Sequence, residues 1–182
     1  MRFFLSGHIP PFDRVLLVES GSRYLLEHLI PGIYSNHPEL QRLDVVTCFP
    51  GQPCTFNPER GRVWRVTDYR GRAGRAQLYA ELAEANHSIL GIICSGEDIM
   101  TRWKAVLAWK SGAKLFILNE NGDYFWVDRE NWATIRHFIL YRLGLSGAGA
   151  VTTILQLFVF PFTITYLLLY AAYVHTRRFL RS

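Results

Sequence analysis

The sequence predicts an α/β fold in which a mostly parallel sheet of five to six strands, joined by crossover helices, precedes a C-terminal membrane helix. Two observations lead to this prediction. Over residues 14–128, short apolar runs alternate with segments of helical periodicity, which is typical of a parallel sheet with crossover helices. From Leu143 to Val174 no side chain is charged, and a helix of about 20 such residues crosses a bilayer.

Length and composition narrow the function classes. The chain has 182 residues, of which 49% are hydrophobic and 19% charged, and these values exclude a disordered tail and a small disulfide scaffold. The net charge is +5, but all 15 acidic residues lie in residues 1–130, so the basic excess belongs to the tail. No recognition motif accompanies the arginines, which excludes nucleic acid as a partner. The three cysteines lack C-x₂-C spacing, so we expect no metal site, and no motif indicates a cofactor.

Strands are expected where an apolar or β-branched run lies between breakers. The expected strands cover residues 14–18, 44–48, 63–67, 89–94 and 115–118. Residues 49–62 are rich in proline and glycine and predict a loop, which is the weak link in the alternation. Asn121-Gly122 lies between two apolar runs, so it predicts a hairpin and a sixth, antiparallel edge strand.

Helical spacing of apolar side chains predicts the crossover helices. The apolar stripe of the first expected helix consists of Tyr24, Leu25, His28, Leu29 and Ile33, with Pro31-Gly32 near its end. The second helix is expected over residues 72–86, and its stripe consists of Leu78, Leu82 and Ala85. The third is expected over 99–110, with a stripe of Ile99, Trp103, Val106 and either Trp109 or Lys110.

The chain is expected to divide into a leader (1–13), the α/β domain (14–128), an amphipathic juxtamembrane helix (129–146), a transmembrane or re-entrant helix (147–174) and a basic tail (175–182). Asp128 is the expected N-cap of the juxtamembrane helix, from Glu130 to Leu143. Arginines flank the apolar run on both sides, so a single span and a re-entrant or in-plane helix remain alternatives, beside a buried helix of a soluble protein. The leader lacks the apolar core of a signal peptide, so we expect the α/β domain in the cytoplasm, at a bacterial inner membrane.

The candidate site lies where two similar turns follow two central strands. In open parallel sheets, ligands bind beyond the carboxyl ends of the strands where the strand order reverses, which for the order 3-2-1-4-5 lies between strands one and four. The turn residues are Ser20, Gly21, Ser22 and Arg23 after strand one, and Ser95, Gly96 and Glu97 after strand four. Small residues with free backbone N–H groups at a helix N-terminus predict a phosphate site, to which Arg23 adds a charge-assisted bond. The alternative is plain helix capping by Ser22 and Ser95.

Other strand ends supply further candidates. Asp68 and Arg70 follow strand three, and Glu120 follows strand five. If the carboxylates of Glu97, Asp98, Glu120 and Asp123 converge, they suit base catalysis or a hard metal ion. The alternative is that they are turn and cap residues. Six arginines between Arg60 and Arg75 suit an acidic lipid surface or a diphosphate-bearing ligand, or else form a solvated face.

A single Rossmann-like unit with one membrane segment resembles half of a two-domain, GT-B type glycosyltransferase. In plan it is similar to the membrane-anchored subunit of the two-subunit N-acetylglucosaminyl transferases. The resemblance covers residues 13–125 and rests on their layout and on the turns Glu19-Ser20-Gly21-Ser22 and Ser95-Gly96-Glu97. In that subunit family the membrane segment comes first, whereas here it comes last, and no catalytic residue is carried over.

The resemblance implies a glycosyltransferase-like component of bacterial-type cell-envelope glycan or lipid synthesis. Its partners would be membrane lipid, a nucleotide-sugar or lipid-phosphate ligand, and a second protein that completes the site. The alternative hypothesis is a non-catalytic, membrane-tethered protein-interaction module. That hypothesis requires an exposed apolar face that receives a partner.

Overall fold

The computed structural model describes residues 6–95, 99–119, 123–146 and 150–179. The chain forms two compact units, Met1–Trp132 and Ala133–Ser182. The first unit holds the sheet and the helices that cover it, and the second holds the apolar C-terminal helix.

Within the described residues, six strands form one sheet in the order β3-β2-β1-β4-β5-β6. The strands are β1 (Arg14–Glu19), β2 (Arg42–Thr47), β3 (Val63–Arg65), β4 (Ile89–Cys94), β5 (Lys114–Asn119) and β6 (Tyr124–Trp126). Strands β1 to β5 are parallel, and β6 pairs antiparallel with β5. The predicted α/β fold, its mostly parallel sheet and its antiparallel edge strand are therefore confirmed. The predicted Asn121-Gly122 turn lies outside the described residues.

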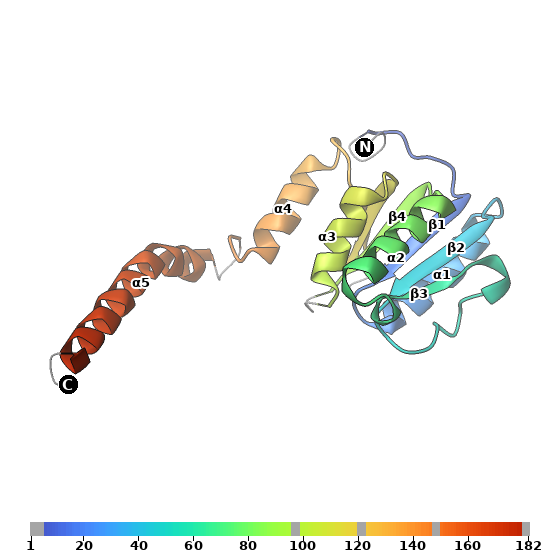
Figure 1. Cartoon of the computed structure of the whole chain (residues 1–182). Coiled ribbons are helices and arrows are strands. Elements are labelled where there is room, and N and C mark those ends of the chain that lie inside the picture. Colours follow the sequence, from blue (N-terminus) through green and yellow to red (C-terminus); the bar gives the residue numbers. More distant parts are fainter. Residues whose placement is uncertain (1–5, 96–98, 120–122, 147–149, 180–182) are drawn as a thin grey trace. The chain divides into compact units, whose positions relative to one another are not determined.

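Helix α1 (Arg23–Asn36) covers one face of the sheet, and α2 (Gly71–Ala85) and α3 (Thr101–Lys110) cover the other (Figure 1). Side chains alternate between the two faces along each strand. Leu17 of β1 belongs to the core cluster that contains Leu26 and Ile30 of α1. Its neighbour Leu16 points the other way, where it lines a cavity together with Leu107 of α3. Because both faces are covered, the central strands are mostly apolar.

The buried stripe of α1 matches the predicted one in part, because Ile33 is buried and Leu25 and Leu29 pack against the core. Leu26, Ile30 and Ile33 are buried, whereas Tyr24 is 70% exposed and His28 is also exposed. Two apolar stripes overlap on this helix, and packing against the sheet selects the aliphatic one. An aromatic ring and an imidazole tolerate the solvent-facing side better than leucine and isoleucine do.

Helix α1 continues through Pro31 to Asn36, so Pro31-Gly32 lies near its end, as predicted. Proline lacks the N–H group that would bond to the carbonyl four residues earlier, which here belongs to Glu27. Residues 49–62 form the predicted loop, and the regular structure described in it is the short 3₁₀ turn η1 (Pro58–Arg60). This loop supplies hydrogen bonds to Glu27. The Thr55 hydroxyl donates to Glu27 O at 3.1 Å, and the Cys54 N–H donates to Glu27 Oε1 at 2.8 Å.

The helices on the other face agree with the sequence in part. Leu78 and Leu82 of α2 are buried, as predicted. In α3 the buried residue is Leu107, and Trp109 is 71% exposed, so the predicted stripe of this helix was wrong. The helix begins at Thr101, which leaves Ile99 in the preceding turn.

The C-terminal part contains α4 (Trp132–Arg142) and α5 (Ala150–Phe179). Helix α4 begins two residues later than predicted, because Asp128 Oδ1 accepts the Asn131 N–H at 2.8 Å and closes a turn first. Within the described residues, α5 is the one helix that is long and apolar enough to cross a membrane, over Val151–Arg177 with mean hydropathy 1.8. It contains Pro161, and none of its apolar window is buried in the structure.

Candidate functional site

The carboxyl ends of β1 and β4 lie side by side, because the two strands are paired in the sheet. Ser20 directly follows β1 and is fully buried, and its hydroxyl donates to the carbonyl oxygen of Ile93 in β4. Gly21 packs against Ser95, which follows β4: a Cβ on Gly21 would lie 2.6 Å from Ser95 Oγ. The structure therefore brings Ser20, Gly21 and Ser95 together where the strand order reverses.

Ser95 carries the unusual feature of this edge. The residue is 9% exposed, its Oγ is buried, and among the described residues Oγ has no hydrogen-bond partner. Most buried polar side-chain atoms have a partner, and a hydroxyl without one costs about 1–3 kcal/mol. Ser95 Oγ is thus a buried donor and acceptor without a partner among the described residues at this edge.

Helix α1 begins beside this hydroxyl with open backbone N–H groups. Ser22 occupies the N-cap position but makes no side-chain cap hydrogen bond, so it does not act as the side-chain cap. The Leu25 N–H bonds to Ser22 O at 3.1 Å, whereas the N–H groups of Arg23 and Tyr24 have no acceptor among the described residues. Open N–H groups at the positive end of a helix favour an anion.

The turn after β4 differs from the prediction. Helix α3 begins at Thr101, and its N-cap is Met100 in the left-handed backbone region at φ 55°. Ser95 therefore neither caps this helix nor lies at its N-terminus. Among the described residues, the turn after β1 is directly followed by a helix, α1, whereas the turn after β4 is not. The candidates Gly96, Glu97, Asp98 and Glu120 lie outside the described residues.

Arg23 already has partners within the protein. Its Nε donates to Glu19 Oε1 at 2.7 Å, its Nη2 donates to Glu19 Oε2 at 3.3 Å, and its Nη1 donates to Pro50 O at 2.9 Å. Glu19 is fully buried at the end of β1. The hydrogen bond from Arg23 to Glu19 raises the pKa of Arg23, and burial opposes this shift. Three of the five guanidinium N–H groups are therefore used within the protein. Glu19 compensates the charge of Arg23, which weakens the predicted charge-assisted bond to a phosphate.

Asp68 and Arg70 are not part of this cluster. Asp68 ends the 3₁₀ turn η2 (Val66–Asp68) after β3, and both side chains are exposed. Their hydrogen bonds go to Thr67: its hydroxyl donates to Asp68 at 3.4 Å, and Arg70 Nε donates to its carbonyl at 3.2 Å. Strand β2 separates β3 from β1, a lateral distance of about 10 Å. The predicted convergence of these residues with Ser95 does not occur in the structure.

Part of the arginine cluster contributes to packing. Arg62 lies 3.1 Å from Glu81 and 5.1 Å from the centre of the Trp64 ring. Glu81 also accepts hydrogen bonds from the Tyr69 hydroxyl at 2.9 Å and from Trp64 Nε1 at 3.0 Å. These hydrogen bonds, that from Tyr69 first, hold the pKa of Glu81 below its ordinary value. Arg62 is thus partly occupied, which reduces the charge available to a lipid or a diphosphate.

Sequence analysis missed a buried polar cluster between β2 and the start of β4. His87 Nε2 lies 2.6 Å from Asp44 Oδ2, and the two side chains are 3% and 0% exposed. Arg42 Nε donates to the same oxygen at 2.7 Å, and the Arg62 N–H donates to Asp44 Oδ1 at 2.6 Å. An acid inside an apolar strand run was the available signal, because such a group is rarely buried without partners.

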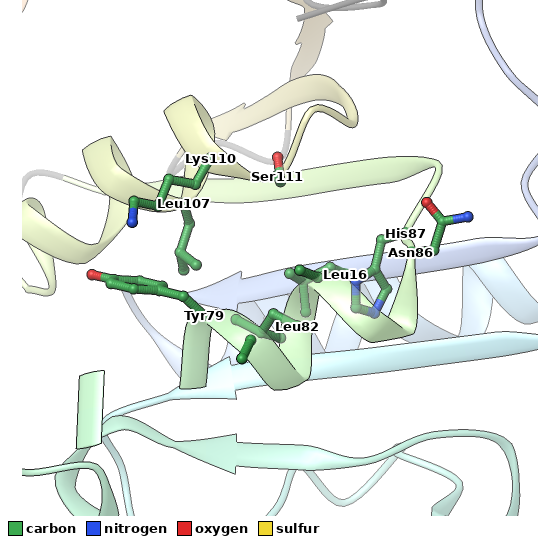
Figure 2. Close-up of a pocket in the computed structure, with 10 residues that line it drawn as sticks. Leu16, Tyr79, Leu82, Asn86, His87, Leu107, Lys110 and Ser111 are labelled. Atoms are coloured by element: carbon green, nitrogen blue, oxygen red, sulfur yellow. The ribbon is translucent and has the colours of Figure 1, made fainter. Parts of the chain in front are cut away.

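A cavity of about 450 Å³ lies between α2 and α3, with His87 at one end (Figure 2). Leu16, Leu82 and Leu107 are part of its lining. Figure 2 shows Tyr79 with Lys110 at the other end, where Lys110 Nζ lies 4.5 Å from the centre of the Tyr79 ring. None of the predicted site residues within the described part of the chain lines this cavity.

The part of the chain that the structure describes contains no cluster of side chains suited to bind a metal ion. No group of three or more His, Cys, Asp or Glu side chains there could hold an ion. Cys48, Cys54 and Cys94 form no disulfide bond, and burial raises the pKa of Cys48. Comparisons of the chain with protein-family models, with curated proteins and with solved structures give no match. The function is therefore inferred from the geometry of the site.

Proposed function

We propose that this chain is a membrane-anchored, Rossmann-like component that binds a phosphate-bearing ligand between the carboxyl ends of β1 and β4. The observation that carries the proposal is the buried, unpaired Ser95 Oγ beside the N-terminus of α1, which has no side-chain cap. A phosphate oxygen accepts hydrogen bonds from a hydroxyl and from backbone N–H groups alike. Gly21, without a Cβ, allows the two turns to approach closely enough to supply both.

Within this proposal the ligand is a nucleotide-sugar or a lipid phosphate. The chain then serves as a glycosyltransferase-like component of bacterial-type envelope glycan or lipid synthesis, together with a protein partner that completes the site. The strand order supports this class, because nucleotides bind at the reversal point of open α/β sheets. The apolar α5 supports it as well, since it would hold the domain on the cytoplasmic face of an inner membrane, close to lipid-linked substrates.

Membrane anchoring is tested separately. The candidate span of 27 residues measures about 40 Å as a helix, which exceeds the ~30 Å hydrocarbon core and permits tilt. After a carbonate wash, the full chain should float with phosphatidylglycerol–phosphatidylcholine vesicles, and a chain that ends at residue 146 should not. Extraction of the full chain by carbonate would contradict an integral anchor.

Ligand binding is tested by thermal-shift measurements on the detergent-solubilised full chain with UDP, GDP, ADP, CMP and pyrophosphate. We expect a rise in Tm for at least one diphosphate, and its loss in Gly21→Arg, which fills the turn against Ser95. The matched control is Asn36→Arg, which adds the same charge at the exposed far end of α1. If the control loses the shift as well, the site is not at this turn. If no diphosphate at millimolar concentration shifts the wild type, this chain alone does not bind the ligand.

A second candidate function, the protein-interaction module, is favoured by an apolar groove of about 460 Å³ on the α1 side of the sheet. Its lining includes Phe12, Phe116 and Trp126, and also Ile9 and Tyr124, which are 45% and 65% exposed. Exposed apolar patches of this kind commonly mark interaction sites. This function places a partner in the groove and leaves Ser95 unused.

A photo-crosslinking amino acid at position 124 distinguishes this candidate. In cells it should give one discrete adduct, whereas the same group at position 24 should give none. Tyr24 is a suitable control, because it is an equally exposed aromatic residue that does not line the groove. Equal labelling from both positions would show random collision and reject the module.

A further inference from the structure

The cavity between α2 and α3 has the size and lining of a small-molecule site. Its volume of about 450 Å³ falls within the range of about 300–1,000 Å³ that is usual for ligand pockets. Leu16, Leu82 and Leu107 are buried and give it an aliphatic lining. Ala80 and Ala83 of α2 also line the cavity and are exposed, so it is open to solvent. A small molecule can therefore enter the cavity and bury an apolar body there.

His87 places an unpaired polar atom at one end of this cavity (Figure 2). Its side chain is 3% exposed, and its Nε2 lies 2.6 Å from Asp44 Oδ2. Asp44 also accepts hydrogen bonds from Arg42 Nε and from the Arg62 N–H, as an ionised carboxylate does. In the neutral imidazole the proton is therefore on Nε2, and Nδ1 keeps a lone pair. Nδ1 has no hydrogen-bond partner among the described residues, so it is the ring nitrogen left for a molecule in the cavity.

Lys110 gives the other end of the cavity a positive charge. Its Nζ lies 4.5 Å from the centre of the Tyr79 ring, and it forms no ion pair among the described residues. The described residues that line the cavity include no acidic side chain. The Tyr79 ring favours this position of the ammonium group, and a cation without an acid beside it in the cavity favours an anionic ligand.

We propose that this cavity binds a small carboxylic acid that has an aromatic body and a hydroxyl group at its far end. The carboxylate contacts Lys110, the ring packs against the leucines and Tyr79, and the hydroxyl donates to His87 Nδ1. A second carboxylate at the His87 end is unfavourable, because it would face a lone pair and lie near the buried Asp44. This site is separate from the phosphate site proposed above, since neither Ser20 nor Ser95 lines the cavity.

The first test changes the ligand and leaves the protein unaltered. Titration calorimetry of the detergent-solubilised full chain compares para-hydroxyphenylpropionate with phenylpropionate, which lacks the hydroxyl. We expect the first to bind and the second to bind about 2- to 10-fold more weakly, the effect of one neutral hydrogen bond. This comparison needs no substitution of His87, which could unfold the buried cluster around Asp44.

The second test removes the charge at the other end of the cavity. Lys110→Met should weaken para-hydroxyphenylpropionate about 2- to 5-fold, the effect of a solvent-exposed ion pair. Binding of para-ethylphenol, which has no carboxylate, should stay unchanged. Lys104→Met is the matched control, because it removes the same charge from α3 at a residue that does not line the cavity.

A third measurement detects the hydrogen bond itself. Of the six histidines in the sequence, His87 is the one among the described residues that lines the cavity. With histidine labelled with nitrogen-15, NMR spectra should show that para-hydroxyphenylpropionate shifts the unprotonated nitrogen of one imidazole and that phenylpropionate does not.

Each result decides the inference. Equal affinities for the two acids, without a shift of an imidazole nitrogen, would overturn the hydrogen bond to His87 and with it the ligand class. An equal loss in Lys110→Met and Lys104→Met would show that overall charge, not the cavity, attracts the acid. No binding of para-hydroxyphenylpropionate at millimolar concentration would overturn the proposal as a whole. The diphosphate titrations are independent of these results, because they test the opposite group of residues at the strand ends.

Discussion

Replacement of Ser95 by alanine tests whether its hydroxyl is held ready for a ligand. The buried Oγ has no partner within the described residues, so its removal recovers a desolvation cost of about 1–3 kcal/mol. Loss of one packed atom costs about 0.8 kcal/mol. The free energy of unfolding without ligand should therefore rise by about 1 kcal/mol, and Tm should rise by about 2–4 °C.

Ser20→Ala is the matched control and should have the opposite sign. Ser20 is also buried at the same sheet edge, but its hydroxyl donates to Ile93 O and lies 3.4 Å from Val18 O. Its removal loses a satisfied hydrogen bond, worth about 1 kcal/mol. Both substitutions delete one oxygen from a buried serine, so the difference in sign isolates the presence of a partner.

The assay is thermal unfolding of the full chain in detergent, followed by tryptophan fluorescence with and without the diphosphate that stabilises the wild type. With ligand, Ser95→Ala should bind about 10- to 100-fold more weakly, the effect of a lost hydrogen bond to a charged group of 1.5–3 kcal/mol. Destabilisation of the unliganded protein by Ser95→Ala, equal to that by Ser20→Ala, would show that the hydroxyl is satisfied. That outcome would refute the reasoning that assigns it to a ligand.

Three further predictions concern the fold. Gly61→Ala should lower the free energy of unfolding by about 3 kcal/mol in denaturant titrations, since its Cβ would lie 1.7 Å from Leu43 O; a loss below 1 kcal/mol would mean that the loop shifts freely. Asp44→Ala should cost about 3–5 kcal/mol in the same titrations, because it leaves Arg42 and a buried imidazole without their carboxylate; a neutral result would show the cluster to be dispensable. The Tyr69 hydroxyl lowers the pKa of Glu81 from 4.5, so the stabilisation by Glu81 is full above that value and disappears as the pH falls through the lowered folded pKa. Unfolding midpoints at pH 2–7 should accordingly show a shallower acid limb for Glu81→Gln, and identical pH profiles would exclude the effect.

The sheet could be predicted because its signals are local. Residues 89–94 are uninterrupted apolar side chains and one glycine, and they form β4 over the full predicted length. The central strands of a parallel sheet are buried on both faces, so a short apolar run suffices to locate them. Which face of α1 is buried could not be predicted in this way. Tyr24 and Leu26 begin stripes of similar hydrophobicity, and contact with the sheet decides which one is buried.

The buried polar residues could not be paired from the sequence, because their partners are distant along the chain. Asp44 and His87 are 43 positions apart. Lys114 is fully buried at the start of β5, where its Nζ donates to Ser6 O at 2.5 Å and lies 3.4 Å from Asp128. A charge inside an apolar run indicates that a partner exists, and only the fold identifies it.

The partners of the side chains at the candidate site could not be predicted from the sequence either. Sequence analysis located the Ser20–Arg23 and Ser95 turns, but it assigned Arg23 to the ligand, whereas the structure pairs that guanidinium with buried Glu19. What remains at this edge is a set of dipoles: the Ser95 hydroxyl and the first N–H groups of α1. Dipoles orient a phosphate, and further positive charge strengthens the binding of a diphosphate. Among the described residues at this edge, Arg23 shares its charge with Glu19, so a partner protein that brings a further cation would tighten the binding of the ligand, in line with the proposed function.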